Sequence, residues 1–173
     1  MKRKIFLTVA TIIFCGIAIE IGMNNNFVMH YAWHIWYGDH IRWHGIDVTI
    51  NDDEYFMPAS KDGKTLYIAN LKLEGAYVVL NANVHTAELE KKFVENFCQS
   101  QNCIQLNEQT YMVGKRKVSS FSFAKLNTNS NIETFQQHVV IDGGGAWVEY
   151  FGSEPSYQKF KPTIDSIVEQ IAH

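Results

Sequence analysis

The sequence lacks the short motifs that usually reveal an enzyme. It contains no GxSxG nucleophile elbow and no dinucleotide-binding fingerprint. Its triple glycine, residues 143–145, is not followed by the Lys-Ser or Lys-Thr of a phosphate-binding loop, so we interpret it as a tight turn between strands. His85 and His138 are isolated in the sequence, and lone histidines of this kind are more often structural. These absences argue against an enzyme.

Basic residues are outnumbered by acidic ones. Lys and Arg total 15 and Asp and Glu total 18, a net charge of −3. Residues 1–22 hold three basic residues and one acidic one, so the remainder has 12 against 17, a net charge of −5. The only basic cluster there, residues 115–117, is typical of the solvated end of a hairpin. Phosphate binding needs a clustered basic face, so nucleic acid is not an expected partner.

Cysteine is also scarce, with three residues in the chain. Cys15 lies in the N-terminal apolar run, while Cys98 and Cys103 are spaced C-x4-C just after an expected helix. A structural zinc or iron–sulfur site needs four ligands, which this pair cannot supply. In an oxidising compartment the pair can close a short disulfide loop, and two free thiols are the alternative.

The most informative feature that is present lies at the N-terminus. Residues 2–4 are all basic and precede an apolar run over residues 5–23. The run has the roughly 20 residues that a membrane span needs, and its basic flank indicates an export signal. We predict that residues 1–22 anchor the chain in a bacterial inner membrane with the rest in the periplasm. The alternative is a signal peptide cleaved near residues 16–18, which would leave a soluble periplasmic protein.

Hydrophobic periodicity predicts an α+β domain. Alternating apolar residues predict strands at residues 45–50, 65–71, 76–80, 109–113, 117–126, 134–141 and 146–151. Apolar residues spaced by four predict an amphipathic helix over residues 86–97, and a second helix follows the N-cap Ser153. Pro162 is expected to kink the second helix or to start a new segment there. A short helix is also expected at residues 27–37. The order predicts an antiparallel sheet packed with two helices, preceded by an N-terminal apolar helix.

Two segments carry a resemblance to a known group of proteins. They are Trp43-x-Gly45-Ile46-x-Val48 and Phe151-Gly152-Ser153-Glu154-x-Ser156-Tyr157-x-x-Phe160-x-Pro162-x-Ile164-x-x-Ile167-Val168. Together with the meander of strands between them, they resemble the Mog1/PsbP-like superfamily, in particular its small bacterial envelope members. The resemblance implies an α/β/α sandwich that binds proteins, sometimes with an associated metal, and has no catalytic residues. It covers residues 43–173, which we predict to form the α+β domain, and leaves residues 23–42 as an aromatic, histidine-rich juxtamembrane segment.

The unmatched segment is the place where the sequence suggests further chemistry. Residues 30–44 contain four of the seven histidines and three of the four tryptophans. On a helix, histidines four residues apart share a face and can hold zinc or copper, with Asp39 orienting or joining them. The candidate ligands of a metal or haem are His30, His34, His40 and His44. A pH-sensitive contact is another interpretation of these histidines.

The aromatic residues of the same segment favour a different role. Rings with a polar edge prefer the membrane–water interface, and these lie just beyond the apolar run. The candidate interface residues are Tyr31, Trp33, Trp36 and Tyr37. Gly38 interrupts helical continuity between the two histidine pairs, which argues against a site made of all four rings.

We therefore predict a non-enzymatic, envelope-facing domain that binds a protein partner and contacts the inner membrane through its N-terminal segment. No cofactor is expected. An immunity protein or a complex-assembly factor would be a specific form of this function, and neither has a motif of its own. The alternative is a periplasmic metal- or haem-handling protein that uses residues 30–44 with copper, zinc or haem. The partner surface is expected at the sheet edge or on the aromatic segment.

Overall fold

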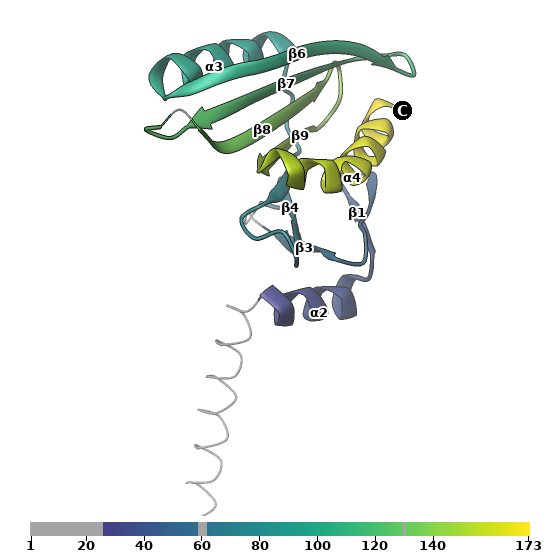
Figure 1. Cartoon of the computed structure of the whole chain (residues 1–173). Helices are drawn as coiled ribbons and strands as arrows, with labels where there is room; N and C mark the ends of the chain where they lie inside the picture. Colours follow the sequence, from purple (N-terminus) through teal and green to yellow (C-terminus); the bar gives the residue numbers. More distant parts are fainter. Residues whose placement is uncertain (1–25, 59–61, 130) are drawn as a thin grey trace, which may run out of the picture.

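A computed structural model describes residues 26–58, 62–129 and 131–173 of the chain (Figure 1). The predicted leader, residues 1–22, lies outside these residues. Within the described ranges, no helix has the length and apolar character needed to cross a membrane. The helices are α2 (Asn26–Tyr37), α3 (Ala87–Ser100) and α4 (Glu154–Ala172). The strands are β1 (His40–Trp43), β2 (Ile46–Thr49), β3 (Glu54–Pro58), β4 (Thr65–Asn70), β5 (Tyr77–Asn81), β6 (Cys103–Val113), β7 (Arg116–Leu126), β8 (Ile132–Ile141) and β9 (Trp147–Gly152).

Seven of these strands form one antiparallel sheet, in the order β3-β4-β5-β9-β8-β7-β6. Strands β1 and β2 form a separate antiparallel hairpin. The sheet therefore ends at β3 on one side and at β6 on the other.

Helices cover the sheet on both faces. Helix α4 packs against β8, β9 and the β2 strand of the hairpin, whereas α3 packs against β6, β7 and β8 on the opposite face (Figure 1). The main core lies beneath α4, where Phe160, Ile164 and Ile167 are almost fully buried. Burying each such side chain contributes about 1.5–3 kcal/mol. A smaller cluster beneath α3 joins Val94 to two phenylalanines of β7.

The fold class predicted from the sequence is confirmed as α+β with antiparallel sheets. The described residues contain three helices: the two expected to pack with the sheet, and α2, which matches the short helix expected at residues 27–37 and also packs against β3. Strands β1 and β3 were not expected, since neither has a long alternating pattern. Helix α3 begins as predicted, with Thr86 as its N-cap accepting a hydrogen bond from the Leu89 N–H.

Of the two alternatives predicted at Pro162, a kink or a new segment, the new segment does not occur. Helix α4 runs through Pro162 as a single element. Pro162 lies on the exposed side of the helix, while its neighbours Phe160 and Thr163 are buried. Packing of the buried face of α4 therefore keeps the helix continuous, although Pro162 has no N–H to donate to the preceding turn.

Candidate functional site

The first sheet edge, β3, is covered by helix α2. His30 donates a hydrogen bond from Nε2 to the carbonyl oxygen of Asp52 at 2.7 Å, and His34 does the same to the carbonyl oxygen of Glu54 at 2.7 Å. Glu54 is the first residue of β3, and Asp52 lies in the turn just before it. The two histidines therefore bind the carbonyl groups at the start of this edge, where another strand could otherwise add.

The second histidine pair lies elsewhere, on the β1–β2 hairpin. His40 Nδ1 is 3.4 Å from the hydroxyl of Thr49, and His44 Nε2 donates to the carbonyl oxygen of Gly63 at 3.0 Å. Asp39 accepts a hydrogen bond from His34 Nδ1 at 2.6 Å. In the part of the chain that the structure describes, no three His, Cys, Asp or Glu side chains are grouped to hold a metal ion. The metal role of the four histidines stays a prediction.

The candidate interface residues all belong to α2. Tyr31 and Trp36 are exposed, by 52% and 80%, and Ile35 between them is exposed by 82%. Trp33 is half-buried, and Tyr37 is the last residue of the helix. The outer side of α2 is thus apolar and accessible, as a membrane-interface helix requires, and this role also stays a prediction.

Cys98 and Cys103 form a disulfide bond, which fits the prediction from their spacing. Their Cα atoms are 4.4 Å apart. The bond joins the last turn of α3 to the first residue of β6, next to the small core beneath α3. It therefore fixes the point at which the second edge strand begins.

A buried His–Glu–His cluster is present that sequence reasoning missed. The Glu90 carboxylate, on α3, is 1% exposed and accepts hydrogen bonds from His138 Nδ1 at 2.7 Å and from His85 Nε2 at 2.8 Å. Burial alone would raise the pKa of Glu90, but the hydrogen bonds and charge of His138 and His85 outweigh it and hold that pKa below its usual value. His85 also stacks on Trp147, with ring centroids 4.4 Å apart. The cluster fastens the start of α3 to the sheet.

The second sheet edge, β6, has eleven residues and pairs with β7 on one side. No strand among the described residues pairs with its other side, so in this part of the chain the edge is open. Nearly every residue of β6 is exposed, including Tyr111 and Met112. Proteins usually protect such an edge with lysine, proline or a covering segment, but β6 contains no proline and a single charged residue, Glu108. A bulge interrupts its register between Gln105 and Asn107 and leaves a regular stretch from there to Val113.

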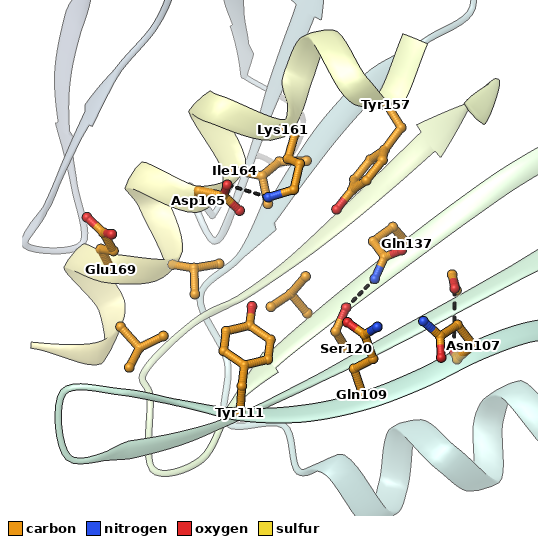
Figure 2. A pocket seen from close by; sticks show the side chains of 14 residues that line it. Asn107, Gln109, Tyr111, Ser120, Gln137, Tyr157, Lys161, Ile164, Asp165 and Glu169 are labelled. Atoms are coloured by element: carbon orange, nitrogen blue, oxygen red, sulfur yellow. Dashed lines mark hydrogen bonds and ion pairs between the residues drawn. The ribbon is translucent and has the colours of Figure 1, made fainter. Parts of the chain in front are cut away.

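A cavity of about 470 Å³ lies between this edge strand and α4 (Figure 2). Its sheet side is polar, and Gln137 there donates a hydrogen bond to the hydroxyl of Ser120. Tyr111 extends from β6 and Tyr157 extends from α4 toward Gln137 (Figure 2). The remaining lining residues on β6–β8 are Asn107, Gln109, Val113, Ser122 and Val139, and those on α4 are Lys161, Ile164, Asp165, Val168 and Glu169.

The cavity carries a small excess of negative charge. Lys161 Nζ lies 2.5 Å from Asp165 Oδ2, in a pair that is about half exposed and contributes little to stability. Glu169 forms no ion pair with any residue that the structure describes. Burial raises the pKa of Tyr157 to about 12, with further contributions from Asp165 and Tyr111. Burial and Asp165 likewise raise the pKa of Tyr111, against the effect of Lys161, so both phenols stay neutral.

A sequence signal for this cavity existed but was not recognised. Tyr157, Lys161, Asp165 and Glu169 recur at every fourth position, so they line one side of α4 next to its apolar face. On β7, Ser120 alternates with buried phenylalanines and places small polar side chains on a face that is apolar elsewhere.

Comparison with known proteins identifies the fold. No family model and no curated protein matches the chain. Among solved structures, the solution structure of cyanobacterial PsbP (CyanoP) from Synechocystis sp. PCC 6803 is similar, with a TM-score of 0.51 over 73% of this chain and 85% of that one. The fold is Mog1/PsbP-like. The sequence identity is 10%, so the likeness concerns the fold alone.

Proposed function

We propose that this chain is a non-enzymatic accessory domain that binds an extended segment of a protein partner along the free edge of β6. The contrast between the two sheet edges carries the proposal. Helix α2 covers the start of the β3 edge through His30 and His34, whereas β6 is long, exposed and almost uncharged. Adding a strand to an exposed edge is a common way to bind a peptide, because main-chain hydrogen bonds provide affinity and side-chain pockets provide specificity.

The register of the β6–β7 hairpin shows which backbone groups are available. Two residues separate the paired Val113 and Arg116, so this pair exchanges hydrogen bonds and the pairs alternate from there. Thr110, paired with Ser119, falls in a non-hydrogen-bonded pair. Its N–H and C=O groups therefore face away from β7, towards an incoming strand.

The expected occupant is a segment of another protein with positive charge. The chain has a net charge of −3, and Asp165 and Glu169 lie beside the open edge. Glu108, on β6 itself, is paired with Lys91, and Asp165 is paired with Lys161, so Glu169 is the acidic group left for a cation of the partner. Charge complementarity of this kind selects partners and speeds association more than it adds affinity. A second copy of this chain would bring the same negative charge to the edge.

The test uses peptides of about ten residues selected from a random library on the full chain held in mild detergent. Thr110→Pro removes the outward N–H without removing a hydrogen bond to β7, and Thr110→Val is the matched control that keeps it. We expect the selected peptides to bind Thr110→Pro roughly tenfold more weakly and Thr110→Val with unchanged affinity. N-methylation at alternate peptide residues should abolish binding.

Two results would overturn the proposal. One is a selection whose peptides bind Thr110→Pro as well as they bind the unmodified chain. The other is a concentration-dependent dimer that Thr110→Pro dissociates, since the edge would then belong to a second copy of the chain.

The location of this domain in the bacterial envelope, tethered to the inner membrane or released by cleavage, is part of the proposal. It is supported by the basic and apolar residues of the leader. A fused reporter enzyme that is active only in the periplasm tests it. We expect the reporter to be active, and to lose its activity when the basic residues 2–4 are replaced and the apolar run is shortened. If a second reporter that works only in the cytoplasm is active in the same fusion and the periplasmic one is not, the proposed location is wrong.

A further inference from the structure

We infer that the cavity beside β6 is a specificity pocket for an arginine side chain of the bound segment. The inference rests on the proposed addition of a strand to β6. Alternate residues of this strand, Asn107, Gln109 and Tyr111, direct their side chains to the cavity. An added strand would lie about 4.8 Å farther out and would place its own alternate side chains on the same face. One of them would enter the cavity from its open side.

The hollow has the character of a ligand site. Its volume of about 470 Å³ falls within the range of about 300–1,000 Å³ that is usual for such sites. Val139 and Ile164 supply apolar surface, while Ser120, Ser122 and Gln137 supply hydroxyl and amide groups. Gln137 donates to Ser120, and Ser122 donates to the carbonyl oxygen of Asn107. A purely apolar side chain would be unfavourable wherever it left another polar atom of the lining without a hydrogen-bond partner.

The charges favour a cation. Lys161 contributes one positive charge and Asp165 and Glu169 contribute two negative ones, so the lining has a net charge of −1. An incoming carboxylate would meet both acidic residues. An incoming cation would find Glu169 without an ion-pair partner in the described residues, and Asp165 held only by a half-exposed lysine.

Arginine suits the cavity better than lysine. Its planar guanidinium offers five N–H donors, and the lining offers the side-chain oxygens of Asn107 and Gln109 as well as the acidic groups. The neutral rings of Tyr111 and Tyr157, on β6 and on α4, offer faces on which a guanidinium can stack. Lysine, with three donors on a compact head, would use fewer of these groups.

The test is a titration of the isotope-labelled full chain with blocked single amino acids, followed by NMR. The probes are N-acetyl-arginine methylamide, its neutral citrulline counterpart and its glutamate counterpart. We expect saturable shifts of residues 107–113 and 161–169 with arginine, binding of citrulline that is roughly tenfold weaker, and no binding of glutamate.

Charge variants of the cavity distinguish a cation site from an anion site, because the two kinds of site predict opposite changes in arginine affinity. Glu169→Gln should weaken arginine binding several-fold, whereas Lys161→Gln should strengthen it. Glu154→Gln makes the same charge change on α4 away from the cavity and is the control. Equal binding of arginine and citrulline, or weaker arginine binding by Lys161→Gln, would overturn the inference.

The two proposals fail separately. If blocked arginine binds the cavity but selected peptides ignore Thr110→Pro, the pocket exists and strand addition is wrong. If Thr110→Pro weakens the peptides but arginine is not preferred, strand addition stands and the pocket inference is wrong.

Discussion

The buried Glu90 cluster makes a quantitative prediction about stability. Replacing Glu90 with alanine removes the acceptor of two hydrogen bonds and leaves the N–H groups of His85 and His138 without it. A buried donor left unsatisfied costs about 1–3 kcal/mol. The His85 side chain is 19% exposed and can turn to water, whereas that of His138 is 6% exposed and cannot. We therefore expect a loss of about 3 kcal/mol, a large part of the about 5–15 kcal/mol typical of a domain.

The measurement is urea unfolding at about pH 7, followed by tryptophan fluorescence, because Trp147 stacks on His85 and reports on the cluster. Glu95→Ala is the matched control, since Glu95 is exposed on the same helix and its removal should change the free energy of unfolding by less than about 0.5 kcal/mol. Values for Glu90→Ala and Glu95→Ala that agree within about 1 kcal/mol would refute the reasoning.

The same comparison has a pH dependence whose sign follows from the pKa of Glu90. That pKa is lowered in the folded protein, so the carboxylate stabilises the fold above its ordinary pKa of 4.5 and loses this effect as pH falls through the folded value. The difference between the unmodified protein and Glu90→Ala should therefore shrink below about pH 4.5. The neighbouring Glu149 is present in both proteins, and burial, the main cause of its raised pKa, is common to both. Only the smaller part of that rise, which comes from the charge of Glu90, enters the difference.

Three further predictions concern other parts of the fold. Burial raises the pKa of Glu54, and its Oε1 has no hydrogen-bond partner among the residues that the structure describes. Glu54→Gln should therefore stabilise the protein by about 1 kcal/mol near pH 8 and by less near pH 4, as thermal unfolding will show. Replacing Cys98 and Cys103 with serine should lower the free energy of unfolding by about 2 kcal/mol, and an intact mass unchanged by reductant would contradict the disulfide. Replacing His30 and His34 with alanine should cost about 1–3 kcal/mol, because the carbonyl groups of Asp52 and Glu54 lose their hydrogen-bond donors. A zinc- or copper-induced rise in melting temperature that this double variant loses would favour the metal-handling alternative instead.

Sequence periodicity predicted the elements in which one face is buried. Helix α3 and strands β7–β9 were found because packing on one side imposes a repeating pattern on their residues. The first half of β6 was missed for the opposite reason, since an edge strand that is exposed on both faces has no hydrophobic alternation. Its existence follows from pairing with β7, which local sequence does not reveal.

The sites were harder to predict than the elements because they depend on residues far apart in the chain. Glu90 and His138 are 48 positions apart and meet only after α3 has packed across the sheet. The four-residue spacing of His30 and His34 was noticed, but their partners are backbone carbonyls, which have no sequence signature. Histidine spacing alone does not distinguish a metal site from a pair that covers a strand edge.

The cover that α2 places over β3 has a consequence for how these molecules can assemble. With one edge blocked and one open, each chain can join a single further strand, and the growth of the sheet stops there. A version without α2 would have two free edges, β3 and β6, on opposite sides of the sheet. The β6 edge of one molecule could then pair with the β3 edge of the next. Such head-to-tail contacts continue from molecule to molecule, so they would build filaments unless the rotation between neighbours closed them into a ring.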